Sequence, residues 1–588
     1  MSEQARSVPR ADGNARRTVA QAIAAALRRH KVPFTFGQSL PSAVHLANAD
    51  IGIRQIVYRT ENAGAYMADG YARVARQVPV VTAQNGPAAT LLVPGLAEAM
   101  KASVPMVAIV QDVPRPAVDR NAFQELDHFD LFRSCAKWVR RLSDPARVDD
   151  YIDMAFTAAA SGRMGPAVLL LPLDLQVEDA VISEARRESL SAFPLDRCLA
   201  DPAAIARAAE LLTQAERPLI VAGGGIHLSG AHEILAEIQE KFALPVATTV
   251  MGKGAVAETH ALSVGVIGYA MGPGSATRYL RPLVEGSDVI FLIGTRTNQN
   301  GTDSWKLFPP SARFIHLDVD PQEIGRNYEA LRLLGDARLT LEALASELAG
   351  RDTTKRLGHR ATLTATIAEA RRKHIDESQA TSRSDRAPAR PERLVSEIEA
   401  VLSESSIVVA DASYASVWIA NGLRALAPGM RFLTPRGMAG LGWGFPMALG
   451  AKLASPGSSV ICLVGDGGFA HVWSELETAR RMGLNVSVTV LNNQVLAYQK
   501  DAEDTRFGRH TDACQLGPVD HAKIAEACGC AGVRIDRPSD YADALRSSLS
   551  ANRTTVIDVM TDPMAYPPIS AFESGLPAVR RSNGQPEA

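Results

Sequence analysis

Short apolar runs alternate with helix-like segments along nearly the whole chain, and this alternation constrains the fold more than any other feature of the sequence. It is the pattern of parallel β-sheets covered by helices. A chain of 588 residues is too long for one core, because single cores stop growing at about 250–300 residues. We therefore predict an α/β fold of three doubly wound parallel-sheet domains. The runs that predict strands fall in three groups: 79–86, 104–112 and 166–175; 217–225, 244–250, 288–296 and 312–320; 406–413, 458–468, 485–493 and 554–562.

Polar stretches predict the domain boundaries. One boundary lies near 186–202, and the charged stretch 381–394 has two prolines and the composition of a linker. The Arg-rich opening could pass for a transit peptide, but it contains acids and has no apolar core, so it is interpreted as a tail. The predicted organisation is a disordered tail, a first domain, a central domain, a linker, a third domain and a second tail, at residues 1–17, 18–190, 191–350, 351–392, 393–570 and 571–588.

The overall composition excludes several classes of partner. A formal net charge of −2 gives no field that would recruit nucleic acid or an anionic membrane. No apolar run approaches the roughly 20 residues that a membrane-spanning helix needs. The expected partners are therefore small molecules or further copies of the chain.

The cysteines indicate a reducing compartment. Six cysteines are scattered through a long chain without a secretory signal, which favours a cytoplasmic protein over a disulfide framework. Cys528 and Cys530 could form half of a metal site. No second Cys/His pair at ligand spacing accompanies them, so two buried thiols at a helix end are the favoured interpretation.

An acidic turn and an amide pair follow two consecutive apolar runs of the third group. Asp466 lies in LVGDGG (463–468), just after an apolar run, and Asn493 ends VTVLNN (488–493), so both are expected at the carboxyl ends of neighbouring parallel strands. Ligands bind at that edge of an open α/β sheet. Gly467 and Gly468 would let backbone N–H groups approach an anion, and carboxylate and amide oxygens suit Mg²⁺. The alternative is a pair of unrelated turns, but the combination favours a magnesium diphosphate site.

The separation of the two turns, 27 positions (493 − 466), resembles the binding motif for thiamine diphosphate (ThDP), which begins Gly-Asp-Gly and ends Asn-Asn. The resemblance implies that Asp466, Asn493 and the backbone carbonyl of Val495 hold Mg²⁺. It also makes residues 393–570 the diphosphate-binding domain, with Gly467 and Gly468 as cofactor contacts.

Two further segments resemble the same family. YRTENAGAYMADGYARV (58–74) is similar to the segment whose glutamate, here Glu61, hydrogen-bonds the cofactor aminopyrimidine, which would make 18–190 the pyrimidine-binding domain; the alternative is a surface glutamate that starts a helix. RGMAGLGWGFPMALGA (436–451) resembles the Gly-rich segment under the bent cofactor, with Leu441 as the wedge between its rings and Met438 as a contact. Ser413 is assigned to the cofactor site in the same way.

Within this superfamily the chain most resembles the catalytic subunit of acetolactate synthase, from about 18 to 570. AFQELDHFDLFRSCAKW (122–138) is similar to a substrate-facing segment, which implies that Gln124 faces the substrate with Phe123 beside it. The middle region resembles that family's flavin-binding region, although ordinary turn chemistry is an alternative for its glycines. The residues that would contact FAD are Arg163, Gly224, Arg296, Asp318 and Asp336.

The resemblance also implies an assembly. The cofactor of this family lies between domains of two subunits, so a homodimer is the smallest expected unit and a tetramer is common among relatives. A small regulatory subunit accompanies many acetolactate synthases and is an open expectation here.

Several positions depart from the synthase pattern. Leu173 replaces a lysine, and 296–300 reads RTNQN in place of Arg-Phe-Asp-Asp-Arg. The stretch 412–418, ASYASVW, replaces Gly-Gln-His-Gln-Met-Trp. After the Asn-Asn pair, 494–510 has no Trp and instead carries Tyr498, Gln499 and Lys500. A changed pocket implies a changed acceptor.

The leading hypothesis is an acetolactate synthase-like enzyme that uses ThDP, Mg²⁺ and a structural FAD. It would decarboxylate pyruvate or a similar 2-oxo acid and transfer the two-carbon unit to a second carbonyl compound. The first alternative is another ThDP reaction: sulfoacetaldehyde acetyl transfer, benzoin-type ligation or lysis, or simple decarboxylation. The others are a flavin oxidase of the pyruvate oxidase kind and a catalytically silent regulatory subunit.

Overall fold

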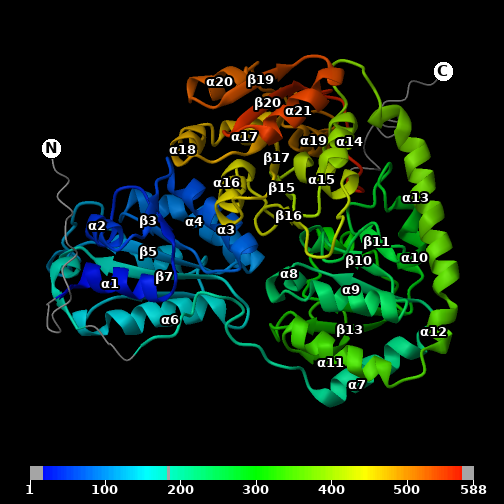
Figure 1. Cartoon of the computed structure of the whole chain (residues 1–588), viewed down its shortest axis with the longest axis horizontal. Coiled ribbons are helices and arrows are strands. Elements are labelled where there is room, and N and C mark those ends of the chain that lie inside the picture. The colour runs from blue at the N-terminus through cyan, green and yellow to red at the C-terminus, as the bar shows by residue number, and fades with distance from the viewer. Residues whose placement is uncertain (1–16, 182–185, 572–588) are drawn as a thin grey trace, which may run out of the picture.

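The computed structural model describes residues 17–181 and 186–571, and within them the chain forms three six-stranded parallel sheets (Figure 1). The prediction of three α/β domains with parallel sheets is confirmed. Both predicted tails lie, apart from Arg17 and Ala571, outside the described residues.

The N-terminal sheet has the strand order β3-β2-β4-β5-β7-β6. β5 and β7 are buried along their whole length, because helices cover both faces of the sheet. A two-residue strand β1 (Arg17–Thr18) pairs with β8 (Asp179–Ala180). The other elements are β2 (Phe34–Phe36), β3 (Arg54–Ile56), β4 (Val80–Ala83), β5 (Met106–Asp112), β6 (Trp138–Arg141), β7 (Pro166–Pro172), α1 (Val19–Arg29), α2 (Ser42–Asp50), α3 (Glu61–Ala75), α4 (Pro87–Ala102), α5 (His128–Phe132) and α6 (Val148–Ala160).

The central sheet has the order β11-β10-β9-β12-β13-β14. Its core strands β9 and β12 are apolar and fully buried, as their continuous apolar runs require. The elements are β9 (Pro218–Ala222), β10 (Val246–Thr248), β11 (Ser263–Val266), β12 (Val289–Ile293), β13 (Arg313–Asp318), β14 (Ala330–Leu334), α7 (Pro202–Gln214), α8 (Gly225–Ser229), α9 (His232–Lys241), α10 (Arg281–Glu285) and α11 (Ala337–Ala349).

The C-terminal sheet has the order β16-β15-β17-β18-β20-β19. The strand order reverses direction between β15 and β17, so the carboxyl ends of these strands border a topological switch point, where ligands bind in such sheets. The elements are β15 (Ile407–Ala410), β16 (Arg431–Leu433), β17 (Val460–Gly465), β18 (Ser487–Asn492), β19 (Ala531–Ile535), β20 (Thr555–Met560), α14 (Pro391–Val401), α15 (Tyr414–Gly422), α16 (Gly444–Ala454), α17 (Asp466–Ala470), α18 (Glu475–Met482), α19 (Ala497–Phe507), α20 (His521–Ala527) and α21 (Tyr541–Ser550).

The segment 351–392, predicted as a linker, is largely helical. It contains α12 (Thr354–Gly358) and the 23-residue helix α13 (Arg360–Ser382), which runs along the edge of the molecule (Figure 1). Ile367 and Ala370 of α13 pack into an apolar cluster of the central domain. The non-helical connection between α13 and α14 is therefore short.

Each of the eleven predicted apolar runs contains a strand, and short edge strands account for most of what the sequence did not predict. β3, β14 and β19 carry exposed polar or charged residues, so they lack the apolar signal that the central strands have. All six cysteines are free, with Cys530 buried and Cys528 partly exposed just after α20. Within the described part of the chain, none of the helices combines the length and the apolar character needed to cross a membrane.

The N- and C-terminal domains meet where α3 crosses α16, two helices that lie side by side in Figure 1. Two glycines allow this close approach. A Cβ added to Gly70 of α3 would lie 2.1 Å from the carbonyl oxygen of Met447, and one added to Gly450 of α16 would lie 1.8 Å from that of Met67. The ring of Tyr66 stacks on Trp443 beside the crossing, with centroids 3.7 Å apart.

We predict that Gly450→Ala lowers the stability of the protein, because its Cβ would force α16 away from the Met67 carbonyl. The free energy of unfolding should fall by about 1–3 kcal/mol. This loss is expected even though alanine inside a helix normally stabilises the helix by about 1 kcal/mol relative to glycine. Thermal and urea unfolding measure the effect. Gly358→Ala at the end of α12 is the matched control, since nothing lies within 4 Å of the added Cβ. Equal stability of the two variants would contradict the close crossing.

Candidate active site

Asp466 and Asn493 lie side by side at the carboxyl edge of the C-terminal sheet. They follow β17 and β18, which pair in parallel with Gly465 opposite Leu491. The Asp466 Oδ2 atom accepts a hydrogen bond from the backbone N–H of Gln494 at 2.7 Å, and Oδ1 accepts one from Gly467 at 2.9 Å. The structure therefore brings together the two halves of the sequence motif, and the N–H of Gln494 links them directly.

This edge offers a donor set for a hard divalent cation. Burial raises the pKa of Asp466 to about 6, against the lowering effect of the N–H groups of Gln494 and Gly467. The Asn493 Oδ1 atom accepts from the N–H of Val495 at 3.1 Å, which orients the amide. Within the described ranges no cluster of three or more His, Cys, Asp or Glu side chains could hold a metal. One carboxylate, one amide oxygen and a backbone carbonyl nevertheless suit Mg²⁺ that also binds phosphate oxygens, so the residues fit a magnesium diphosphate.

Asp411, which the sequence analysis missed, organises the Gly-rich segment beside this edge. It follows β15 and is buried. Its carboxylate accepts from the N–H groups of Gly442, Trp443 and Gly444 at 2.9, 3.0 and 3.1 Å, at the start of α16. A Cβ on Gly468 would lie 2.0 Å from the Asp411 Oδ2 atom, so this glycine is required for packing as well as for the predicted phosphate approach. An Asp directly after an apolar run was the available signal.

The predicted cofactor and substrate segments hold four non-glycine residues with left-handed backbones: Gln124, Ser413, Ala439 and Gln494, with φ of 60°, 66°, 59° and 60°. Such conformations cost about 1–3 kcal/mol each and gather at functional sites. Leu441 is half-buried, whereas Met438 is 57% exposed. Ser413 precedes α15, and its carbonyl accepts from the Ser416 hydroxyl.

Glu61 starts α3 in the N-terminal domain and is 7% exposed, so the alternative of a surface glutamate is wrong. Burial raises its pKa, partly opposed by a hydrogen bond from its own backbone N–H. Among the described residues no hydrogen bond or ion pair joins Glu61 to Asp466 or Asn493. The two groups are held by sheets of different domains.

The predicted substrate residues lie at the carboxyl edge of the N-terminal sheet. Phe123 is 83% exposed, and the Gln124 Oε1 atom accepts from Gln84 Nε2 at 2.6 Å. The Asn85 amide donates to the carbonyls of Phe123 and Gln124 at 3.2 and 3.1 Å. Gln84 and Asn85 follow β4 and were not singled out from the sequence. Leu173, at the same edge, is 45% exposed and donates its N–H to the Asp112 carbonyl.

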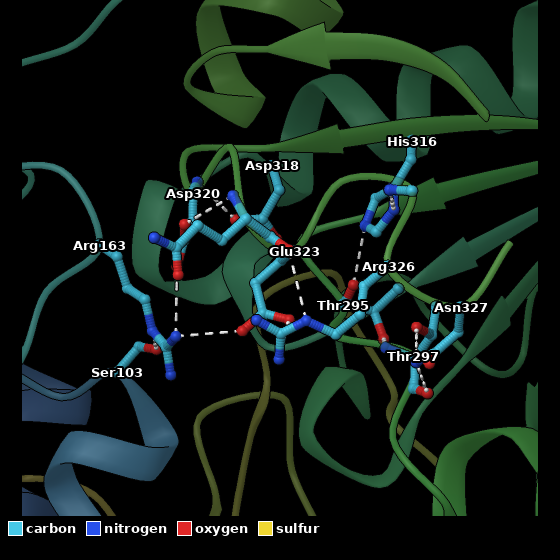
Figure 2. Close-up of polar contacts among 12 residues, drawn as sticks. Ser103, Arg163, Thr295, Thr297, His316, Asp318, Asp320, Glu323, Arg326 and Asn327 are labelled. Atoms are coloured by element: carbon cyan, nitrogen blue, oxygen red, sulfur yellow. Dashed lines mark hydrogen bonds and ion pairs between the residues drawn. The ribbon is translucent and has the colours of Figure 1, made fainter. Parts of the chain in front are cut away.

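The five residues predicted to contact FAD line one pocket, which is formed mainly by the central domain: Arg163, Gly224, Arg296, Asp318 and Asp336. Residues of all three domains contribute to this pocket, with Ser103 from the first domain and Arg436 from the third. Arg163 reaches Asp320 Oδ2 at 3.2 Å and Glu323 Oε1 at 3.1 Å across the domain boundary (Figure 2).

Two acids of the pocket differ in their freedom to bind a ligand. Burial raises the pKa of Asp318 to about 6, and its Oδ1 accepts from the N–H of Asp320 (Figure 2). Asp336 caps α11, pairs with Arg197 at 2.7 Å and accepts from the Ser229 hydroxyl at 2.8 Å. The Asp336 carboxylate is therefore occupied by the fold, and its N–H and C=O groups bond to the Cys198 carbonyl and the Thr340 N–H, so Asp318 is the freer of the two acids.

Of the three glycines that follow β9, two pack closely against Gly294 and one leaves space on the pocket side. A Cβ on Gly223 would lie 2.3 Å from the carbonyl oxygen of Gly294, and a Cβ on Gly225 would lie 2.7 Å from the Cα of Gly294. A Cβ on Gly224 would meet nothing closer than Met251 at 3.4 Å. Gly224 therefore leaves room on the pocket side, next to the N-terminus of α8, for a ligand that approaches the backbone closely.

Comparison with known proteins agrees with this arrangement. Three family models match: the N-terminal TPP binding domain of thiamine pyrophosphate enzymes at 17–131, their central domain at 205–344 and their C-terminal TPP binding domain at 411–559. The chain belongs to the thiamine pyrophosphate enzyme family.

The relatives that the chain matches include several acetolactate synthases. The chain is 34% identical to the acetolactate synthase large subunit of Parasynechococcus marenigrum, over 93% of this chain and 88% of the relative. It is 30% identical to the acetolactate synthase of Arthrospira platensis, over 97% and 98%. It is 29% identical to the acetolactate synthase isozyme 3 large subunit of Escherichia coli, over 87% and 88%.

We predict that Asp466→Ala and Asn493→Ala weaken binding of ThDP with Mg²⁺ at least about tenfold, because each removes an oxygen donor to the cation. Isothermal titration with ThDP at fixed Mg²⁺ measures the affinity. Asp543→Ala in the same domain is the control, since its carboxylate is 86% exposed and faces only Arg546. Unchanged affinity in both site variants would place the diphosphate elsewhere.

Proposed function

We propose that the chain is an acetolactate synthase-like enzyme that uses ThDP and Mg²⁺ to decarboxylate pyruvate or a similar 2-oxo acid and to join the acyl unit to a second carbonyl compound. The observation that carries the proposal is the assembled edge of Asp466 and Asn493, in a chain that also buries Glu61 at a helix start. The names of its relatives supply the reaction.

When bound, ThDP supplies the nucleophilic carbon and accepts the electron pair released on decarboxylation. The protein supplies orientation and proton placement. Asp466, Asn493 and the Val495 carbonyl would hold the cation that binds the diphosphate. Gly467 and Gly468 would let the diphosphate approach the backbone N–H groups. Leu441 would contact the rings of the cofactor.

Glu61 would share a proton with the aminopyrimidine, and its raised pKa suits that role. Phe123 would pack beside the substrate, and Gln124, held by Gln84, would hydrogen-bond it.

A homodimer is the proposed active unit. Glu61 and the magnesium edge lie on separate domains, and Phe123 and Met438 expose large apolar side chains that a second subunit would cover. Relatives named large subunit support a small regulatory partner. Free cysteines support a reducing, cytoplasmic location.

A second candidate is a different ThDP carboligase or lyase, and the acceptor side of the site favours keeping it. Leu173, 45% exposed, supplies no charge at the edge of the N-terminal sheet. Lys500 is paired with Asp504 at 2.7 Å, and Tyr498 of the same helix is 40% exposed. A neutral Leu173 and a Lys500 whose charge is already paired suit an acceptor without a carboxylate.

The function is tested by proton NMR of the protein with ThDP, Mg²⁺, FAD and pyruvate. We expect pyruvate loss with formation of 2-acetolactate, and we expect Glu61→Gln to reduce turnover at least about 100-fold because its proton-sharing carboxylate is lost. Glu233→Gln, on an exposed glutamate of α9, is the control. Pyruvate loss without acetolactate would favour the second candidate or an oxidase, and substantial turnover by Glu61→Gln would overturn the site assignment.

We propose FAD as the ligand of the central pocket, with a structural role. The open side of Gly224 leaves room for a diphosphate to approach the backbone, and the partly exposed Asp318 carboxylate at the end of β13 fits ribose hydroxyls. Arg163 and Arg296 add positive charge to the same pocket.

We predict that Gly224→Val removes bound flavin without unfolding the domain, because its side chain would enter the pocket while its Cβ makes only an ordinary contact with Met251. Flavin absorbance of the purified protein, before and after denaturation, gives the bound fraction. Gly457→Ala, which has free space around its Cβ, is the control. Flavin bleaching at the rate of turnover under anaerobic conditions would instead support the oxidase alternative.

A further inference from the structure

Glu475 connects the diphosphate side of the chain to the backbone that carries Glu61. It lies nine residues after Asp466 (475 − 466), at the start of α18, and its side chain is fully buried. Its Oε1 atom accepts from the backbone N–H groups of Arg59 at 3.1 Å and Thr60 at 3.2 Å. Thr478 donates its hydroxyl to the Oε2 atom at 2.8 Å. The next residue after this anchored dipeptide is Glu61.

Glu98 makes the same kind of contact in the opposite direction. It lies on α4 of the N-terminal domain and is fully buried. Its carboxylate accepts from three consecutive N–H groups of the C-terminal domain, those of Gly437 at 2.7 Å, Met438, and Ala439 at 3.3 Å. These residues lead directly to Leu441. Each domain therefore holds the backbone of the other domain's predicted cofactor segment with one buried carboxylate.

Holding the two domains together does not require the Glu475 and Glu98 carboxylates. Apolar packing already joins the two domains at α3 and α16, and a buried charge in such an interface stabilises less than apolar groups of similar size. Thr60, at the start of α3, has no side-chain cap of its own, so Glu475 supplies the anchor from another domain. What a carboxylate adds, through its charge-assisted hydrogen bonds, is a fixed backbone position.

We propose that Glu475 and Glu98 are a reciprocal pair of positioning residues that pre-set the backbones of Glu61 and of the 437–441 segment before the cofactor binds. The inference rests on the proposed ThDP function. It assigns to the contact between the domains a catalytic purpose in addition to folding, because misplacement of a reacting group by about 1 Å can cost about 100-fold in rate.

The first test measures exchange of the C2 proton of bound ThDP for deuterium by quenched-flow NMR, together with ThDP affinity. We expect Glu475→Gln to slow this exchange about 10- to 100-fold, because the misplaced Glu61 no longer assists it. We expect Glu98→Gln to weaken ThDP binding about tenfold, because the 437–441 segment loses an anionic acceptor.

The matched control is Glu258→Gln. Glu258 is also a buried carboxylate that crosses a domain boundary: its Oε2 atom accepts from the N–H of Ala425 at 2.9 Å and pairs with Lys253, and it contacts neither the Glu61 segment nor the 437–441 segment. It should lose stability with unchanged exchange and affinity. If all three variants change exchange and affinity alike, or if Glu475→Gln and Glu98→Gln match the wild type, the positioning role is overturned.

The failure of this inference can be told apart from failure of the proposed function. Exchange in the wild type that is lost in Glu61→Gln supports ThDP chemistry whatever Glu475→Gln does. A second measurement needs no variant: amide deuterium exchange of the wild-type protein without cofactor. The N–H groups of Arg59, Thr60 and 437–439 should already be protected. Protection that appears only after ThDP binds would overturn pre-setting.

Discussion

The close crossing of α3 and α16 is the contact on which the candidate site depends. It fixes the N-terminal domain against the C-terminal domain through Gly70, Gly450 and the stacked pair Tyr66 and Trp443. α3 begins at Glu61, and α16 begins just after the segment with Leu441. A rigid crossing therefore fixes the positions of the first residues of both helices. The groups at these helix starts are held in place by the close packing of the crossing.

Three buried acids around this crossing accept hydrogen bonds from backbone N–H groups. Asp411 holds the start of α16, Glu98 holds the segment before it, and Glu475 holds the residues before α3. A buried carboxylate costs free energy unless its oxygens are satisfied. These three carboxylates are thus committed to the fold, while Glu61 has a raised pKa and Phe123 and Met438 keep exposed surface. Those are the groups left available to cofactor, substrate and a second subunit.

Much of the fold and part of the site could be predicted from the sequence. Continuous apolar runs identified the central strands because strands buried on both faces need apolar residues throughout. The edge strands β3, β14 and β19 were missed because they expose polar residues and have no such pattern. The segment around α13 was predicted as a linker because it is polar, and the structure shows a helix that buries little more than Ile367 and Ala370. Glu98 and Glu475 gave no signal, since a single glutamate on an amphipathic helix is normally exposed.

The sequence by itself determined which chemical groups stand at the ends of which strands. Asp466 and Asn493 follow adjacent apolar runs, and parallel pairing of neighbouring strands then requires that they meet. Only the tertiary structure decided that Glu61 is buried, that five separated residues share the central pocket, and that Glu475 and Glu98 each hold the other domain's backbone. The reason is physical. The ends of strands can be predicted from the sequence because the spacing of apolar residues is a local property. Burial and long-range hydrogen bonds depend on how segments that are distant in the sequence pack together.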